Sequence, residues 1–290
     1  MAEICTKGID TGFVALGYAK VAVLGVVQGI TELLPISSTA HMRLVPAVLG
    51  WQDPGSAFSA AMQLAALAAI VSFFWTDVRE LATNSFRAIS HCQFHDQNFR
   101  FSLRIILATI PIGVAGLLLA NVLNACNSPL RNLSVIGWAC LAMAVLLGIA
   151  EVRARHTRTI DNSTSVDAIL VGFAQVGALI PGVSRSGSTL TAALALGFKR
   201  EEAARLSFLL GLPAIALAGL KEIWALHKIH LDAHGWSVLL LGLIVASISA
   251  FLAIWGLMRF LQQFSTWPFV IYRFLLGVII LIGVATGWLV

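Results

Sequence analysis

Charged residues are scarce in this sequence: Asp, Glu, Lys and Arg together make up 11% of its 290 residues. A soluble domain carries about 25% of such residues, because its surface must stay hydrated. The scarcity therefore excludes an ordinary soluble domain of this length. Hydrophobic residues make up 58% of the chain, a composition typical of a protein that lies within a membrane.

Cysteine is also rare, and the four cysteines are scattered without any C-x-x-C pair. This pattern predicts neither a disulfide framework nor a structural zinc site. The formal net charge is +5, but the basic residues form no continuous face with interleaved aromatics, so a nucleic acid is not expected as a partner. A modest positive charge suits a protein that lies among anionic lipids. The lipid bilayer is therefore the predicted partner of the protein.

Long hydrophobic blocks run through most of the chain. Each block has about 18–22 residues with almost no charge, which matches a hydrocarbon core of about 30 Å at the helical rise per residue. The blocks lack the two-residue alternation of barrel strands, so they are predicted to be helices. The sequence therefore predicts an all-α polytopic membrane protein. The blocks are Phe58–Trp75, Ile105–Val122, Leu133–Ala150, Leu206–Trp224, Trp236–Trp255 and Phe269–Val290.

Two further segments mix apolar residues with proline and hydroxyl residues. The first runs from Gly25 to His41 and the second from Gly172 to Thr189. Each has an apolar half, a proline, a Ser/Thr-rich turn and a second apolar half, which a straight helix does not tolerate. Non-helical backbone at membrane depth occurs only where protein or a watery cavity surrounds it. We therefore predict two re-entrant helix hairpins whose tips meet inside the protein.

The two broken segments also repeat each other. Gln28 precedes Ser37 by nine residues, and Gln175 precedes Ser184 by nine. Three of the long apolar blocks follow each segment. We therefore predict one membrane domain over 1–290, with a first repeat over about 12–150 and a second over about 166–290. Because each repeat has an odd number of spans, the second copy is predicted to be inverted.

The distribution of basic residues predicts an orientation. With the N-terminus outside, the inside segments hold ten Lys and Arg residues and the outside segments hold five. Cytoplasmic loops carry an excess of such residues, so we predict that both termini lie outside. On this orientation, Asp77–Arg100 and Arg153–Asp167 are predicted to be polar loops on the inside. The outside residues are Lys7, Lys20, Arg131, Lys221 and Lys228.

Glu32 is the first candidate for a functional residue. An ionisable side chain within an apolar segment is energetically expensive, and such residues usually mark a site. Gln28 lies one helical turn earlier on the same face. The alternative is that Glu32 lies near the membrane surface and only caps or pairs with a loop charge.

Arg185 is the second candidate, because it lies in a turn of hydroxyl residues at the start of a predicted helix. Backbone N–H groups and the helix dipole make such a turn an anion site, and a guanidinium binds phosphate oxygens as a fork. The alternative is that Arg185 only neutralises Glu32, and the two roles are compatible. The predicted phosphate-binding turn consists of Ser184, Arg185, Ser186, Gly187 and Ser188.

Ser37, Ser38, Thr39 and His41 complete the candidate site. Taken alone, a Ser/Thr cluster at a helix break is often only a cap, and a buried histidine is more often structural than catalytic. Beside Glu32, these residues supply a nucleophile, an acid–base group and an anion cradle, which are the parts of phosphoryl transfer.

Three motifs carry a resemblance to a known family. The sequence resembles the undecaprenyl-diphosphate phosphatase family of the bacitracin-resistance type, and the resemblance extends over nearly the whole chain, as far as Tyr272-Arg273. The motifs are Gln28-Gly-Ile-Thr-Glu32, Pro35-Ile-Ser-Ser-Thr-Ala-His41 and Pro181-Gly-Val-Ser-Arg-Ser-Gly-Ser-Thr189.

The resemblance implies a bacterial inner-membrane enzyme that hydrolyses the C55 polyprenyl diphosphate left after peptidoglycan polymerisation. Hydrolysis would take place toward the periplasmic side and would regenerate the monophosphate carrier. The catalytic roles of the family fall on Glu32, Ser38, His41 and Arg185. The resemblance also implies a divalent cation, Mg²⁺ or Ca²⁺, as cofactor.

Two departures from the family pattern concern the first motifs. Gln28 takes the place of the first of two acids, so Glu32 is the only carboxylate there that could hold a metal. The cation is therefore also expected to enter with the diphosphate. Ala40 takes the place of a commoner glycine, so no positive φ is expected at that position.

These residues suggest a mechanism with one open point. Arg185 and the turn hold the diphosphate together with Gln28, Ser37 and Thr39, while Glu32 and His41 manage protons. Ser38 is the favoured nucleophile, with a water or His41 as alternatives. A transporter of polyprenyl phosphate lipids is the rival function, because inverted repeats suit alternating access. A lipid-binding protein without activity is a third possible function. The sequence leaves the oligomeric state open, with a homodimer as one possibility.

Overall fold

A computed structural model describes residues 5–6, 9–119 and 129–289 of the chain, and the elements are almost entirely helical. The exception is one antiparallel pair of two-residue strands near the N-terminus. Lys7, which the sequence analysis placed outside, lies beyond the described residues. Residues 120–122, at the end of a predicted span, also lie beyond them. The elements are β1 Cys5–Thr6, β2 Ile9–Asp10, α1 Phe13–Leu33, α2 Ser38–Leu49, α3 Ser56–Ala61, α4 Gln63–Phe73, α5 Trp75–Ser90, α6 Gln97–Leu118, η1 Pro129–Arg131, α8 Leu133–Arg153, η2 Ile160–Asn162, α9 Ser165–Val176, η3 Gly177–Leu179, α10 Arg185–Ala195, α11 Arg200–Lys228, α12 Ala233–Gln263 and α13 Trp267–Ala285.

Within the described residues, 7 helical segments are long and apolar enough to cross a membrane. Six of them correspond to the blocks predicted from the sequence, so that prediction is confirmed. The additional one is α1, which is a single helix of 21 residues with a non-helical kink at Gly17. The sequence analysis had assigned only its second half, as the first arm of a hairpin.

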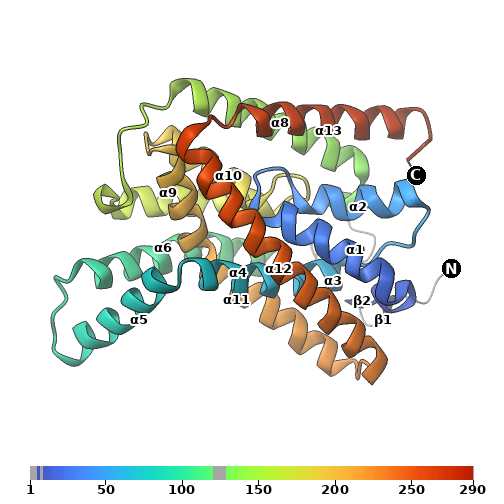
Figure 1. Cartoon of the computed structure of the whole chain (residues 1–290), viewed down its shortest axis with the longest axis horizontal. Coiled ribbons are helices and arrows are strands. Elements are labelled where there is room, and N and C mark those ends of the chain that lie inside the picture. The colour runs from blue at the N-terminus through green and yellow to red at the C-terminus, as the bar shows by residue number, and fades with distance from the viewer. Residues whose placement is uncertain (1–4, 7–8, 120–128, 290) are drawn as a thin grey trace.

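The long helices pack in pairs that are distant in sequence. α1 lies along α12, α8 along α13, and α6 along α9 (Figure 1). Two glycines allow this close packing: a Cβ at Gly29 would lie 2.4 Å from the Ala246 carbonyl oxygen, and one at Gly172 would lie 2.5 Å from that of Ala108. Small residues allow helices in a membrane to approach until their backbones touch. This packing places α1 and α9, the helices that precede the two breaks, against long helices.

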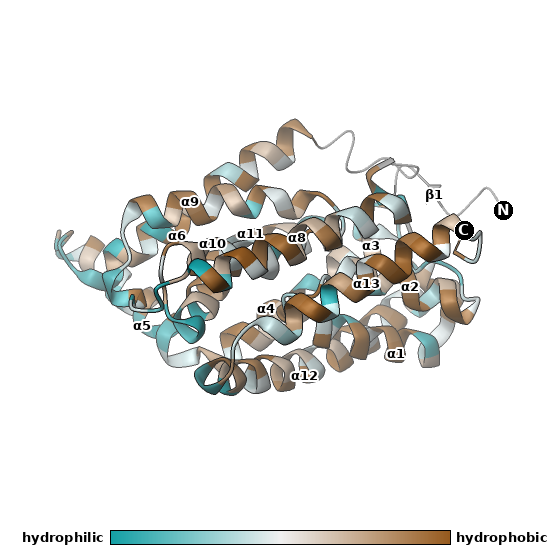
Figure 2. Cartoon of the chain, turned by 90° about the horizontal axis from the view of Figure 1, so that it is seen from above, coloured by the Kyte–Doolittle hydropathy of each residue, from teal (hydrophilic) through white to brown (hydrophobic). Residues whose placement is uncertain are grey.

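The surface has the polarity expected of a protein in lipid. Figure 2 shows hydrophilic residues gathered on α5 and the loops near it, whereas the long helices are mainly hydrophobic. Large apolar side chains such as Leu117, Leu118 and Val152 are largely exposed on these helices. A water-soluble protein does not expose so many large apolar side chains, so lipid is the solvent that suits this surface.

One sequence prediction about the surface was wrong. Asp77–Arg100 was predicted to be a polar loop, but Trp75–Ser90 forms helix α5 and α6 begins at Gln97. A polar composition indicates exposure to water and not irregular backbone, because a surface helix satisfies its own backbone hydrogen bonds and directs charged side chains outward. The start of α1 and the end of α13 lie on the opposite side of the protein from the α5–α6 loop (Figures 1 and 2).

Both predicted helix breaks occur, and their local geometry is the same. α1 ends at Leu33 and α2 begins after Ser37, while α10 begins after Ser184. Ser37 and Ser184 are the N-caps of the following helices, with φ of 73° and 68°. A positive φ is uncommon for serine, and such strained backbone clusters at functional sites. Ala40 is not among the residues with positive φ and lies within α2, as predicted.

Candidate active site

The tips of the two helix breaks contact each other in the interior. Ser186 Oγ lies 3.1 Å from the carbonyl oxygens of both Glu32 and Leu34, to which it donates. The Arg185 guanidinium donates from Nη2 to Glu32 Oε1 at 3.3 Å. The predicted meeting of the two tips is therefore present, and it joins residues that are more than 150 positions apart.

A buried arginine from a third element holds both tips. Arg273 lies on α13 and its side chain is fully buried. Its Nη1 donates to the Pro35 carbonyl oxygen at 3.2 Å, and its Nη2 donates to the carbonyl oxygens of Gly182, at 2.6 Å, and Val183. These carbonyls belong to broken helices and have no partner in a regular helix, so the guanidinium satisfies groups that would otherwise be buried without hydrogen bonds. The sequence analysis did not assign Arg273 a role, although a cation inside an apolar block was a usable signal.

Glu32 accepts hydrogen bonds from three polar side chains. Gln28 Nε2 donates to Oε2 at 2.9 Å, and Ser38 Oγ donates to the same oxygen at 2.6 Å, while Arg185 contacts Oε1. These contacts satisfy the oxygens of the buried carboxylate and fix its orientation. The carboxylate therefore lies where it can take the proton of the Ser38 hydroxyl, which is the arrangement of an activated nucleophile.

Arg185 has hydrogen-bonding capacity beyond its contact with Glu32. Its Nε and Nη1 are buried and have no hydrogen-bond partner among the described residues. Gly211 on α11 approaches the same guanidinium, since a Cβ built there would lie 2.3 Å from Nη1. Buried donors without partners are rare in proteins, so unused guanidinium N–H groups beside a cavity indicate an anionic ligand.

A cavity of about 290 Å³ opens at this point. Its wall also contains apolar residues from α2, α6 and α11, such as Met42, Ile112 and Ala214. Three charged residues without a predicted role line it as well: Arg43, Asp53 and Arg131. The predicted site residues that line the cavity are Gln28, Glu32, Ser38, Thr39, Ser184 and Arg185.

Several of the predicted residues make hydrogen bonds within the two turns themselves. Ser37 caps α2 by accepting from the Ala40 amide, and Ser184 caps α10 by accepting from the Gly187 amide at 3.2 Å. The Ser188 hydroxyl donates to the Arg185 carbonyl oxygen. In the predicted phosphate-binding turn, the Gly187 amide is thus already engaged, and the amides of the first helical residues are the ones left to bind an anion.

His41 is held at both ring nitrogens. Nδ1 lies 2.7 Å from the Ser37 carbonyl oxygen, so it must carry the proton and donate. Nε2 lies 2.6 Å from the Tyr272 hydroxyl, which then donates to it. The two rings are stacked, with centroids 5.7 Å apart. His41 is not among the described residues that line the cavity, so its contact with the reaction centre runs through the turn that holds Ser38.

The residues present do not form a complete metal site. The described residues contain no group of three or more His, Cys, Asp or Glu side chains that could hold a metal ion. Glu32 is the single carboxylate at the helix tips, and its oxygens already accept from Gln28, Ser38 and Arg185. A divalent cation needs several oxygen ligands, and a neighbouring guanidinium opposes it electrostatically. The protein groups alone therefore do not fit a resident cation.

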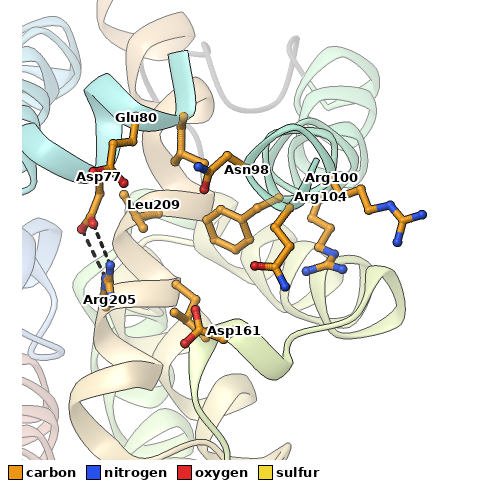
Figure 3. Close-up of a pocket in the computed structure, with 12 residues that line it drawn as sticks. Asp77, Glu80, Asn98, Arg100, Arg104, Asp161, Arg205 and Leu209 are labelled. Atoms are coloured by element: carbon orange, nitrogen blue, oxygen red, sulfur yellow. Dashed lines mark hydrogen bonds and ion pairs between the residues drawn. The ribbon is translucent and has the colours of Figure 1, made fainter. Parts of the chain in front are cut away.

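A second polar cavity, also of about 290 Å³, lies among α5, α6, η2 and α11 (Figure 3). Arg205 pairs with Asp77 there through two hydrogen bonds, of 2.6 Å and 3.2 Å. Arg100 is drawn pointing away from this pair. This cavity is lined by three carboxylates and three guanidiniums, whereas the cavity beside Arg185 is lined by two carboxylates and three guanidiniums. The balanced charges make this cavity less suited to an anion.

One protein family matches the sequence over most of its length. A sequence model of the family described as bacitracin resistance protein BacA matches residues 21–279. The chain belongs to this family. The match includes both helix breaks and the Arg273 that joins them. The resemblance noted from the motifs is thereby confirmed.

Several relatives in the BacA family resemble the chain over most of its length. Undecaprenyl-diphosphatase 2 of Mesorhizobium japonicum is 73% identical over 262 residues, which cover 90% of this chain and 99% of the relative. Undecaprenyl-diphosphatase of Gloeobacter violaceus is 48% identical over 277 residues, 94% of each chain. Undecaprenyl-diphosphatase of Synechococcus elongatus is 47% identical over 268 residues, 92% of this chain and 93% of the relative.

Proposed function

We propose that the chain hydrolyses undecaprenyl diphosphate to undecaprenyl phosphate and inorganic phosphate, and so recycles the lipid carrier of cell-wall synthesis. Its family and the names of its relatives support this function. The observation that carries the proposal is the contact of 2.6 Å between Ser38 Oγ and Glu32 Oε2, beside an arginine with unused donors. A hydroxyl, a base and an anion site in one cavity are what phosphoryl transfer requires.

In the proposed reaction, Ser38 Oγ transfers its proton to Glu32 and forms a bond to the terminal phosphorus. The bond between that phosphorus and the bridging oxygen breaks, and undecaprenyl phosphate leaves as an oxyanion. A water then attacks the phosphoserine, and Ser38 Oγ regains the proton from Glu32. The oxygen and both protons of the water leave with inorganic phosphate. Direct attack by a water or by His41 is the alternative to the Ser38 step.

The other residues of the site have supporting roles in this proposal. Arg185 binds the diphosphate oxygens, and the hydroxyls of Thr39 and Ser184 face them across the cavity. Gln28 orients the Glu32 carboxylate through its hydrogen bond of 2.9 Å. Ser37, Ser186, Gly187 and Ser188 shape the two turns. His41 acts on Ser38 through the Ser37 carbonyl, which belongs to the preceding residue.

We further propose that the two broken segments are re-entrant hairpins of inverted repeats in the inner membrane, with the cavity open to the periplasmic side. The matching Ser37 and Ser184 caps support the repeat. Arg131, which the charge pattern places outside, lines this cavity. Arg100, which ends a segment that the same pattern places inside, lines the other one. The apolar part of the cavity wall suits the first isoprene units of the lipid, and a homodimer remains an expectation.

A divalent cation, Mg²⁺ or Ca²⁺, is proposed to enter bound to the diphosphate. The single carboxylate at the helix tips supports this route, because diphosphate oxygens would supply the ligands that the described residues do not. Chelation should then weaken productive substrate binding and leave the fold intact. Phosphate release with EDTA, compared with the melting temperature under the same conditions, separates these two effects.

The test of the proposed function is phosphate release from C55 diphosphate by purified protein in detergent, with and without Mg²⁺, beside Arg185→Ala. Release by the wild type that the variant loses would support a phosphatase at this site. If well-folded wild type releases no phosphate with or without Mg²⁺, hydrolysis is refuted. A liposome flip assay would then test the rival function, transport of a polyprenyl phosphate lipid.

A further inference from the structure

Three charged residues line the candidate active-site cavity but take no part in the reaction proposed above. Arg43 lies on α2, five residues after Ser38, and Arg131 is the last residue of η1. Asp53 lies in the loop between α2 and α3. All three line the cavity that Glu32 and Arg185 also line.

A single carboxylate holds both arginines. Asp53 Oδ2 accepts from Arg43 Nη1 and from Arg131 Nη2, the latter at 3.2 Å, while Oδ1 accepts from the Gly55 amide at 3.2 Å. The cluster therefore has two positive charges and one negative charge. Each guanidinium has five N–H donors, and the bonds described for Arg43 and Arg131 use one donor of each. Most of their donors are available to a ligand.

Both guanidiniums can reach a ligand in the cavity. Their side chains are 30% and 18% exposed, so they are partly open and yet held in place by Asp53. Ser38, Thr39, Met42 and Arg43 all line the cavity, so one face of α2 runs along it. The Cα of Arg43 lies about 7.5 Å farther along the axis than that of Ser38, and helical side chains lean back toward the N-terminus. Arg43 and Ser38 therefore border the same cavity at different levels along α2.

The cavity thus contains two separate cationic centres, Arg185 at the helix tips and the Arg43–Arg131 pair farther along α2. We propose that Arg43 and Arg131, positioned by Asp53, form a second anion site that binds the phosphate group of the diphosphate that Arg185 does not hold. This inference rests on the proposed function. Its consequence is selectivity, because a lipid monophosphate cannot occupy both centres at once and is released after the reaction.

The binding test uses methylenediphosphonate, which resembles a diphosphate but is not hydrolysed, and inorganic phosphate. Titration calorimetry on purified protein in detergent should show that Arg43→Gln and Arg131→Gln each weaken diphosphonate binding about 10-fold, or about 1.4 kcal/mol. Phosphate binding should change less than about twofold, because Arg185 still holds one group. Arg43→Lys keeps the charge and should recover part of the affinity.

Arg79→Gln is the matched control, since Arg79 is exposed on α5 and should leave binding unchanged. Unchanged melting temperatures of the variants confirm that they fold. Wild-type diphosphonate affinity in both Gln variants would overturn the proposal. Equal weakening of both probes would also overturn it, because it would indicate a general field effect instead of a second site.

Kinetics separate this inference from the proposed function. With C55 diphosphate, Arg43→Gln should raise KM about 10-fold and change kcat less than about twofold, since the Ser38–Glu32 pair is untouched. If the arginine variants lose diphosphonate binding but the wild type releases no phosphate, the second anion site stands and the phosphatase does not. If the wild type is active and the variants bind and react normally, the phosphatase stands and the second site is refuted.

Discussion

Gly211→Ala provides a direct test of the position of Arg185. A Cβ at this position would lie 2.3 Å from Arg185 Nη1 and 3.5 Å from Cζ. Non-bonded heavy atoms in contact are about 3.5 Å apart, so the guanidinium must move by about 1.2 Å. Arg185 is the flexible end of a side chain, so we expect it to move while the backbone of α11 stays in place.

The displacement should lower activity strongly and stability little. The Arg185–Glu32 contact is already 3.3 Å, and a further shift of about 1.2 Å breaks it. Misplacement of a positioning group by about 1 Å can reduce the rate about 100-fold, so we expect a loss of this size in kcat/KM. Alanine is favoured over glycine within a helix by up to about 1 kcal/mol, so the melting temperature should not fall by more than a few degrees.

The assay is phosphate release from C55 diphosphate, with the melting temperature measured in the same detergent. Gly113→Ala is the matched control, because Gly113 is also helical and a Cβ there meets no atom within 4 Å. A folded Gly211→Ala protein with activity within about twofold of wild type would refute the placement of Arg185 in the reaction. A loss of both activity and folding would show instead that α11 cannot accept the methyl group.

Three further predictions concern the nucleophile, the buried clamp and the loop before α9. Ser38→Ala should lower kcat at least about 1,000-fold and abolish a trapped phosphoserine, whereas near-normal turnover would assign the attack to a water or to His41. Arg273→Met leaves the Pro35 and Val183 carbonyl oxygens without a donor and leaves that of Gly182 with only the weak Cys140 thiol. It should lower the unfolding free energy by about 3 kcal/mol, measured by denaturation in detergent; an unchanged stability contradicts the clamp. Burial alone raises the pKa of Asp167, but hydrogen bonds from Arg158 and Thr164 outweigh it and hold that pKa below its ordinary value. The stabilisation is therefore fully present above the unfolded pKa of about 3.9 and is lost as pH falls through the folded pKa. The melting-temperature difference between wild type and Asp167→Asn should be present at pH 7 and disappear at low pH, and a difference independent of pH would contradict this role.

The sequence alone determined the features that depend on local pattern. Lengths of apolar blocks decide which segments can cross a membrane, so six of the 7 candidate spans were predicted and only α1 was missed. Proline and hydroxyl residues within apolar sequence marked the breaks before α2 and α10, because proline removes a backbone hydrogen bond and serine and threonine favour caps and turns. Glu32 and Arg185 stood out for a similar reason, since an isolated charge in an apolar segment needs a compensating partner. In contrast, the polar Asp77–Arg100 segment was wrongly predicted to be a loop, because composition reports exposure and not backbone conformation.

Only the tertiary structure decided which distant residues meet. Glu32 and Arg185 are 153 positions apart, and His41 and Tyr272 are 231 apart. No periodicity relates such pairs, because their contacts arise from how whole helices pack. The role of Arg273 in joining both helix breaks, and the grouping of Arg43 and Arg131 around Asp53, depend on the same packing. Local chemistry thus marked the candidate residues for phosphate chemistry, while the packing of helices brought six of them into one cavity.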